Sequence, residues 1–214
     1  MSLGDTAVTS FTGTFTRPKL IAPLQIARAM PPVCPRWGSI GVVGLDDYGA
    51  RRDFGRTPEP PPSGERPWEG PARFVVQEHH ARSLHWDFRL EHDGVGVSWA
   101  VPKGVPLQPR ENRLAVPTED HPLSYFTFEG QIPPGEYGAG TVKIWDEGTY
   151  ECEKWTDREV EVVLHGRRLR GRYVLFRTGP RAWMIRRLDP PQDPGREPMP
   201  AFGSIVPMLA TPAE

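Results

Sequence analysis

The amino-acid sequence predicts a mainly β protein, folded as a compact antiparallel β-barrel with short flanking helices and extended N- and C-terminal segments. Three observations lead to this fold class: strict apolar and polar alternation from Leu84 to Glu91, a turn signal at Asp93-Gly94, and closely spaced strand-like runs in the second half of the chain. The 26 prolines and 22 glycines among 214 residues supply the turns that such a fold needs.

The alternating stretch predicts a strand with an apolar face and a polar face, the latter carrying His85, Asp87, Arg89 and Glu91. Asp93-Gly94 favours a type I′ hairpin turn, because both central positions of that turn need a positive φ. The turn sets a register in which apolar residues face one another and the polar residues face small ones. The polar-face pairs are Asp87 with Ala100, Arg89 with Ser98, and Glu91 with Gly96. This face therefore leaves room for a bound group.

A divalent metal ion is a suitable occupant of that space. His85 and Asp87 lie roughly 6.6 Å apart along one strand face, so both can reach a single ion. His79 is the expected third ligand, because it ends the preceding strand-like run, whereas His80 is expected to take no part. Two imidazoles and one carboxylate favour manganese, iron or zinc over magnesium or calcium. The alternative is a solvated polar face that binds nothing.

Residues 1–49 predict an N-terminal extension that is partly ordered at best, and the charged and Pro-rich stretch 51–70 reads as a linker by composition. Pro122 places His121 on a loop, and the glycine-rich stretch 135–140 precedes a strand, which predicts a turn and not a phosphate-binding loop. Further strands are predicted at Arg113–Val116, Tyr125–Phe128, Thr141–Trp145, Thr149–Lys154, Val160–His165, Arg172–Arg177 and Ala182–Leu188.

Charge and cysteine content bound the partners and the compartment. The net charge of −1 gives no overall preference for nucleic acid, yet nine arginines stand between Arg158 and Arg187 against two acids. That segment predicts either a phosphate-backbone contact or a solvated strand face. Two cysteines, Cys34 and Cys152, make no disulfide framework and are expected to be structurally inert. With no signal-peptide pattern and no apolar run of about 18 residues, a cytoplasmic location is expected.

Five ordered motifs then carry a family resemblance: RRDFGRTPEP, QEHHARSLHWDFRLEHDG, SWAVPKG, RLAVPTEDHPLSYFTFEG and IPPGEYGAGTVKIWDEGTYE. From about Arg51 to Pro191 the chain resembles the 3′-phosphoesterase domain of bacterial DNA ligase D, a repair enzyme of non-homologous end joining. The resemblance implies a manganese-dependent hydrolase that removes a 3′-phosphate or a 3′-terminal ribonucleoside and leaves a clean 3′-OH end. It also implies a β-barrel with the metal site in a concave face.

The resemblance further implies roles for particular residues and segments. Metal ligands fall on His79, His85 and Asp87. Residues around the scissile phosphate fall on Arg52, Arg89, His121 and Tyr125, and further substrate-binding positions fall on Asp53, Glu59, Gln77, Lys103 and Arg113. The implied domain covers residues 50–190, and 191–214 resembles a linker into a ligase module. Implied partners are DNA 3′ ends on a primer-template, together with ligase and polymerase modules. No lysine is followed by x-Asp-Gly, the ligase nucleophile signature, so DNA sealing by this chain alone is not expected.

Two other functions remain open from the sequence. A DNA-end binding module that recruits a ligase or polymerase without turnover is consistent with the arginine-rich strands. An iron and 2-oxoglutarate oxygenase would use His85, Asp87 and the distant His165 as a facial triad, with Arg172 or Arg177 holding the keto acid. Turnover of a 3′-phosphorylated oligonucleotide separates the hydrolase from both alternatives.

Overall fold

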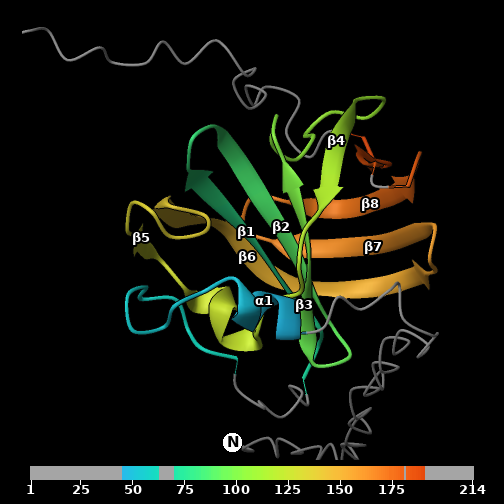
Figure 1. Ribbon diagram of the computed structural model, residues 1–214. Coiled ribbons are helices and arrows are strands. Elements are labelled where there is room, and N and C mark those ends of the chain that lie inside the picture. Colours follow the sequence, from blue (N-terminus) through green and yellow to red (C-terminus); the bar gives the residue numbers. More distant parts are fainter. Residues whose placement is uncertain (1–44, 63–69, 181, 191–214) are drawn as a thin grey trace, which may run out of the picture.

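The structure is a computed structural model that describes residues 45–62, 70–180 and 182–190. Eight antiparallel strands close into a barrel in the order β1-β2-β3-β4-β9-β8-β7-β6, with β6 pairing back to β1 and the short β5 added to β6 (Figure 1). The predicted mainly β barrel is therefore confirmed. The strands are β1 (Arg73–His80), β2 (Leu84–His92), β3 (Val95–Val101), β4 (Asn112–Pro117), β5 (Gly130–Ile132), β6 (Gly140–Trp155), β7 (Glu159–Gly166), β8 (Arg170–Arg177) and β9 (Trp183–Arg187).

Two short helices flank the barrel, the α-helix α1 (Leu45–Ala50) and the 3-10 helix η1 (Leu123–Thr127). Helix α1 lies across the predicted boundary between the N-terminal extension and the domain, and its Tyr48 is buried. The rest of the predicted extension and the predicted tail 191–214 lie outside the described residues. Figure 1 shows α1 and η1 side by side at one end of strands β1 to β3. They cover the outer side of the barrel there.

The β2–β3 hairpin has the register that the sequence predicts. Trp86 faces Val101, Asp87 faces Ala100, and the pairing continues in step to the turn. Asp93 has φ 48° and Gly94 has φ 84°, so both central turn positions are in the left-handed region that a type I′ turn requires. A local sequence signal is sufficient here because the turn alone fixes every pair of the two strands.

Two sequence expectations are corrected by the structure. The run Tyr125–Phe128 was expected to be a strand, but the chain forms η1 instead, since Pro122 and Tyr125 carbonyls accept short-range bonds from the Tyr125 and Phe128 amides. The two strands expected on either side of residues 146–148 are one continuous β6, which pairs first with β1 and then with β7. Gly148 permits this continuity, because a Cβ there would lie 2.3 Å from the His165 carbonyl oxygen.

Strand β1 is buried on both faces, and this places the polar face of the hairpin. Phe74 and Val76 point into the main core inside the barrel, whereas Val75 packs outside it against Leu123 and Phe126 of η1. Side chains alternate along a strand, so Gln77 and His79 continue on the outer face with Val75. The predicted metal ligands therefore lie outside the barrel, on the side that α1 and η1 cover.

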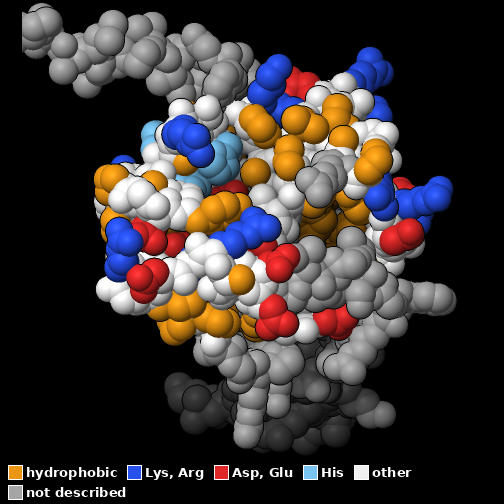
Figure 2. Space-filling view, viewed as in Figure 1, with side chains coloured by type: hydrophobic (Ala, Val, Ile, Leu, Met, Phe, Trp, Pro, Cys, Tyr) orange, Lys and Arg blue, Asp and Glu red, His pale blue; other side chains and the backbone are white. Residues whose placement is uncertain are grey.

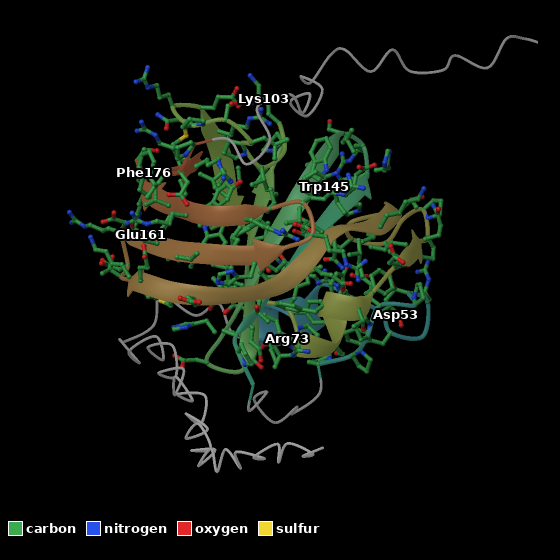
Figure 3. The ribbon with its side chains drawn as sticks, turned by 180° about the vertical axis from the view of Figure 1, so that it is seen from behind. Asp53, Arg73, Lys103, Trp145, Glu161 and Phe176 are labelled. Carbon is green, nitrogen blue, oxygen red and sulfur yellow. The ribbon has the colours of Figure 1, made fainter. Side chains whose placement is uncertain are left out.

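The arginine-rich segment lies on another side of the molecule, and two of its arginines, Arg167 and Arg172, are paired with acids. Arg172 donates to Glu153 at 2.9 Å and to Glu161 at 2.8 Å, and Arg167 donates to Glu147 at 2.9 Å. Figure 3 places Glu161 of β7 and Asp53 near α1 on opposite sides of the view. Arg181 lies outside the described residues. This compensation of charge favours a solvated strand face over a phosphate-binding one.

Two smaller expectations concern the cysteines and the membrane. Cys152 is buried in the main core and disulfide-bonded, so the expectation that it is inert is wrong. Cys34 lies outside the described residues. Of the helices in the part of the chain that the structure describes, none is long and apolar enough to cross a bilayer.

Candidate functional site

A cavity of about 440 Å³ opens on the outer face of β1 and β2. Figure 2 shows histidine and cationic side chains together on this side of the molecule. The walls come from the α1 loop, the β1–β2 hairpin, the segment before η1 and the turn after β5. Its charged and aromatic lining residues are Arg52, Glu59, His79, Arg82, His85, Asp87, Arg89, Glu119, His121, Tyr125, Glu136 and Tyr137. Segments far apart in the sequence thus meet in one concave site.

Three potential metal ligands converge in one wall of this cavity. The ligand atoms of His79, His85 and Asp87 all lie within 4.8 Å of one another. His79 faces His85 directly across the β1–β2 ladder, so the strand register brings the third ligand to the other two. Nδ1 of His79 lies 3.5 Å from Oδ2 of Asp87, and Nε2 of His85 lies 3.7 Å from Oδ1. The expected third ligand is therefore in place to share an ion.

Backbone carbonyls orient both imidazoles for ligation. Nε2 of His79 lies 2.8 Å from the Gly138 carbonyl oxygen, and Nδ1 of His85 lies 2.9 Å from the Ser83 carbonyl oxygen. A carbonyl can only accept, so each of these nitrogens carries the hydrogen and donates it. The other nitrogen of each ring is then a bare lone pair that faces Asp87, which is the arrangement a metal-binding histidine needs. The donor set fits a divalent transition metal.

Asp87 is a carboxylate in this site. Its burial alone would favour the neutral acid, but the Arg89 guanidinium holds the pKa of Asp87 below its ordinary value. Nη2 of Arg89 donates to Oδ2 at 3.1 Å. The carboxylate therefore supplies the negative charge that a bound cation requires.

Arg89 is fixed beside the metal ligands by bonds on all sides. Its Nε donates to Oε1 of Gln77 at 2.8 Å, and its Nη1 donates to Oγ of Ser98 at 2.8 Å. Gln77 is fully buried and donates in turn to the Tyr125 and Phe128 carbonyl oxygens at 3.0 and 2.9 Å. Gln77 therefore fixes the Arg89 side chain from its buried side and does not line the cavity. Ser98, the small residue predicted opposite Arg89, is therefore itself a hydrogen-bond partner of Arg89.

His121 is placed by a backbone bridge to β3. The His121 amide donates to the Gly96 carbonyl at 3.0 Å, and the Gly96 amide donates back at 2.8 Å. Gly96 is required because a Cβ there would lie 2.6 Å from the Phe126 ring. Through this bridge the loop histidine is brought beside Arg89, with Nδ1 of His121 2.9 Å from Nη1 of Arg89.

The His121 imidazole is neutral in the free protein. Burial, with the Arg89 and Arg52 guanidinium groups, lowers its pKa well below the usual value. Nδ1 also lies 2.8 Å from the Glu119 carbonyl oxygen, and Nε2 lies 3.5 Å from Nη2 of Arg52. The Glu119 carbonyl favours a hydrogen on Nδ1, whereas the Arg89 donor on the same nitrogen favours a lone pair there. The neutral imidazole therefore lies between two guanidinium groups, one at each ring nitrogen.

Arg52 enters the site from the segment that composition presents as a linker. Its Nε donates to Oε1 of Glu59 at 2.8 Å, and its Nη1 donates to Oε1 of Glu119 at 3.1 Å. The Tyr48 ring lies beneath its guanidinium carbon at 3.9 Å from the ring centre. Glu59 also accepts from the Tyr125 hydroxyl at 3.0 Å, and burial raises the pKa of Tyr125 so that this hydroxyl keeps its proton. Two guanidinium groups therefore face one cavity, a suitable site for a phosphate.

Besides Gln77, three further residues implied by the resemblance do not line the cavity. Asp53 is exposed, and its Oδ1 accepts from the Gly55 amide at 3.0 Å in the loop after α1. Lys103 is exposed, and Arg113 donates to the Lys103 and Gly104 carbonyl oxygens beyond the end of β3. In Figure 3 Lys103 and Asp53 lie at opposite ends of the molecule. A single small ligand in the cavity cannot touch all of them.

Residues that the sequence reasoning did not single out also take part. Glu119 bridges Arg52 and Arg51, Tyr48 supports Arg52 from α1, and Tyr137 closes the rim. Glu119 and Tyr137 stand inside the quoted motifs, so their motif positions were the available signal. His165, the third residue of the alternative oxygenase triad, is exposed on β7 and bonded to Glu151 at 3.1 Å. That triad is not assembled.

The register makes a prediction about the space beside the ligands. Ala100 lines the cavity directly opposite Asp87, so Ala100→Leu is expected to lower bound metal by placing an isobutyl group against the carboxylate. Val101→Leu is the matched control, because Val101 is fully buried in the core, where overpacking affects stability by about 1–3 kcal/mol. Elemental analysis of the two purified variants checks this. Equal metal content in both would contradict it.

The chain is similar over most of its length to known repair proteins. Residues 77–177 match the family described as the DNA Ligase D 3′-phosphoesterase domain. The multifunctional non-homologous end joining protein LigD of Mycobacterium bovis is 52% identical over 171 residues, which cover 78% of this chain and 22% of that protein. LigD of Mycolicibacterium smegmatis is 46% identical over 178 residues, covering 78% of this chain and 23% of that protein.

A relative from another genus gives the same result. LigD of Pseudomonas aeruginosa is 49% identical over 142 residues, which cover 63% of this chain and 17% of that protein. The chain thus spans about a fifth of the length of these relatives. The matched segment holds the converging histidine and aspartate ligands, Arg89 and His121. The chain therefore belongs to the DNA ligase D 3′-phosphoesterase family.

Proposed function

We propose that this protein is a manganese-dependent phosphoesterase that cleans DNA 3′ ends during double-strand-break repair. It removes a 3′-phosphate or a 3′-terminal ribonucleoside and leaves a 3′-OH. One observation carries the proposal: a ligand set for a transition metal and two guanidinium groups share one cavity, with a histidine between the two arginines. Family membership supports the same reaction class.

In the proposal, His79, His85 and Asp87 hold the ion. A bound manganese ion would neutralise charge on a nonbridging phosphate oxygen and lower the pKa of a bound water. Arg52 and Arg89 bind the remaining phosphate oxygens through the guanidinium hydrogens that their protein partners leave free. Because both side chains are already fixed by carboxylate and amide partners, little ordering is needed when the phosphate binds.

His121 is the proposed proton donor to the leaving 3′ oxygen. Its imidazole is neutral in the free protein because it is buried and two cations flank it, which lowers its pKa. An incoming phosphate anion offsets that positive charge and favours the imidazolium, whose Nδ1 hydrogen already has the Glu119 carbonyl as acceptor. The protonated Nε2 can then donate to the oxygen that leaves. Tyr125 keeps Glu59, and through it Arg52, in position.

The proposal includes a biological setting. The LigD relatives are named as multifunctional end-joining proteins, and this chain corresponds to about a fifth of them. We propose residues 50–190 as the catalytic domain, 191–214 as a linker toward a ligase module, and the cytoplasm as the location. The substrate is a primer-template end, and ligase and polymerase modules act on the product.

Turnover of a 3′-phosphate primer-template tests the proposal. Release of inorganic phosphate is expected to stop on chelation and to return best with manganese, because two imidazoles and a carboxylate form a softer site than magnesium prefers. The same DNA with a 3′-OH end is the control. Full activity in excess EDTA would exclude the metal, and DNA binding without phosphate release would favour an end-binding module. Iron with 2-oxoglutarate should yield no succinate.

A further inference from the structure

Tyr137 is an exposed aromatic side chain at the rim of the phosphate cavity. Its exposed fraction is 46%, whereas most large apolar side chains of the described chain are covered. It lines the same cavity as Arg52, Arg89 and the metal ligands. The reaction proposed above assigns it no task. An exposed ring beside a phosphate site is a suitable surface for whatever is attached to the phosphate.

The ring is tied to the phosphate-binding residues through its hydroxyl. Nη1 of Arg51 donates to the Tyr137 hydroxyl at 3.0 Å, and that hydroxyl lies 3.5 Å from Oε2 of Glu119. Glu119 accepts from Arg52 through its other oxygen at 3.1 Å. The guanidinium carbons of Arg51 and Arg52 lie 5.2 and 5.5 Å from the ring centre. The ring therefore stands directly beside a proposed phosphate ligand.

The backbone that carries the ring is fixed to the metal site. The next residue, Gly138, accepts the Nε2 hydrogen of His79 with its carbonyl oxygen. Gly138 has φ +75°, and a Cβ there would lie 3.6 Å from Cε1 of His79. The turn that presents Tyr137 thus also orients a metal ligand. The ring has a set position relative to the reacting phosphate before any substrate binds.

The cavity is large enough to hold an organic group beside the phosphate. Its volume of about 440 Å³ is within the range of pockets that take small organic ligands. Its lining includes the apolar Ala81, Ile132 and Ala139 as well as the charged Arg82 and Glu136. In a 3′-phosphorylated end, the group joined to the phosphate is the terminal sugar with its base. A base has a flat face that stacks on aromatic rings whatever its identity.

We propose that Tyr137 is a stacking platform for the terminal nucleobase, and that it makes the site prefer nucleic-acid 3′ ends over small phosphate esters without selecting the base. This rests on the proposed phosphoesterase function. The platform acts on substrate affinity and not on the bond-breaking step. Its removal therefore raises KM and leaves kcat nearly unchanged.

Two substrates and three proteins test the platform. The substrates are 3′-phosphate oligonucleotides that differ only in whether the terminal nucleotide carries a base or is a tetrahydrofuran abasic residue. Tyr137→Ala is expected to lower kcat/KM on the order of 10- to 100-fold for the end with a base, the range of base and aromatic stacking. On the abasic end the same variant should lose less than about 3-fold, since no stacking is left to remove.

Tyr137→Phe separates stacking from the hydroxyl network. It keeps the ring and removes the bonds to Arg51 and Glu119, so it should behave nearly as the parent protein on the end with a base. Leu188→Ala is the surface control, because Leu188 is also exposed, at 38%, and does not line this cavity. A loss in Tyr137→Phe as large as in Tyr137→Ala, equal for both substrates, would overturn the platform.

Affinity gives a second readout that needs no turnover. Fluorescence anisotropy in EDTA compares the binding of the two ends by the parent protein and by Tyr137→Ala. A base-dependent loss of affinity supports the platform even if the protein releases no phosphate, in which case the phosphoesterase proposal alone fails. Equal affinity of both ends for the parent protein would overturn the platform while leaving the phosphoesterase proposal intact.

Discussion

Asp87→Asn is expected to remove bound manganese and phosphoesterase activity together. The substitution keeps the shape of the side chain but removes the negative charge between two imidazoles and the Arg89 guanidinium. Asp87 is 6% exposed, so water has little access to compensate for the lost negative charge. With the carboxylate gone, the buried arginine and a cation would repel each other. Turnover should fall by at least about 100-fold, beyond the effect of losing an outer partner of a metal ligand. Elemental analysis and phosphate release measure both quantities.

Arg89→Lys is the matched variant from the same strand face. A lysine keeps the positive charge but lacks the planar fork, so turnover should slow by about 1–3 kcal/mol of transition-state stabilisation while manganese content stays near that of the parent protein. His121→Ala should also retain its metal and lose activity. If His121→Ala loses manganese while His79→Ala keeps it, the third ligand is His121 and the proposed roles of these histidines are reversed.

The second large effect is expected on stability. Glu59→Gln should lower the free energy of unfolding by about 3 kcal/mol, because it leaves a buried arginine with one of its two carboxylate partners missing. The Glu59 side chain is 0% exposed and that of Arg52 is 4% exposed. Glu59 also accepts from the Thr57 and Tyr125 hydroxyls at 2.8 and 3.0 Å. Urea denaturation gives the midpoint and the slope from which the change is calculated.

An exposed ion pair provides the control for this measurement. Glu159→Gln breaks a contact with Lys154 in which the two side chains are 35% and 47% exposed. Surface pairs of this kind contribute about 0–1 kcal/mol. If both substitutions shift the urea midpoint equally, the Arg52 and Glu59 pair does not act as a buried one. Glu59→Gln should also slow turnover, since Arg52 loses the partner that orients its Nε.

The hairpin shows what the sequence alone can determine. Alternation from Leu84 to Glu91 and the Asp93-Gly94 turn are local signals, and a one-residue slip would move every side chain to the wrong face. The register that they predict is the observed one. The same reasoning predicted that His79, His85 and Asp87 lie close together. Their potential ligand atoms are all within 4.8 Å of one another. Local rules suffice wherever both partners belong to neighbouring strands.

The other half of the site depends on contacts between distant segments. Arg52 meets Glu119 across 67 residues and Tyr125 meets Glu59 across 66. No periodicity records such contacts, so composition alone presented residues 51–70 as a linker. Family resemblance, through the motif RRDFGRTPEP, was the only signal that pointed to Arg52, which lines the cavity. His121 likewise depends on a backbone bridge to Gly96, for which the local sequence has no signal.

The two corrected elements have similar causes. Tyr125 and Phe126 read as part of an alternating strand, but both are buried because a short helix packs on β1 from outside the barrel. The stretch from Asp146 to Gly148 separates two strands that the sequence analysis predicts. The Asp146 carboxylate accepts hydrogen bonds from the backbone amides of Arg167, Arg168 and Leu169. It therefore stabilises the loop between β7 and β8 and forms no turn of its own. Tertiary partners override local preference in both places.

Closure of the barrel also determines how copies of this domain behave when they are crowded together. Among the strands that the structure describes, each barrel strand has a hydrogen-bonded neighbour on both sides, and only β5 has one neighbour. Strand β5 is three residues long, too short to template pairing with another chain. Open edges are what make β proteins aggregate. Several copies held close together therefore have no long edge, among the described strands, through which to polymerise.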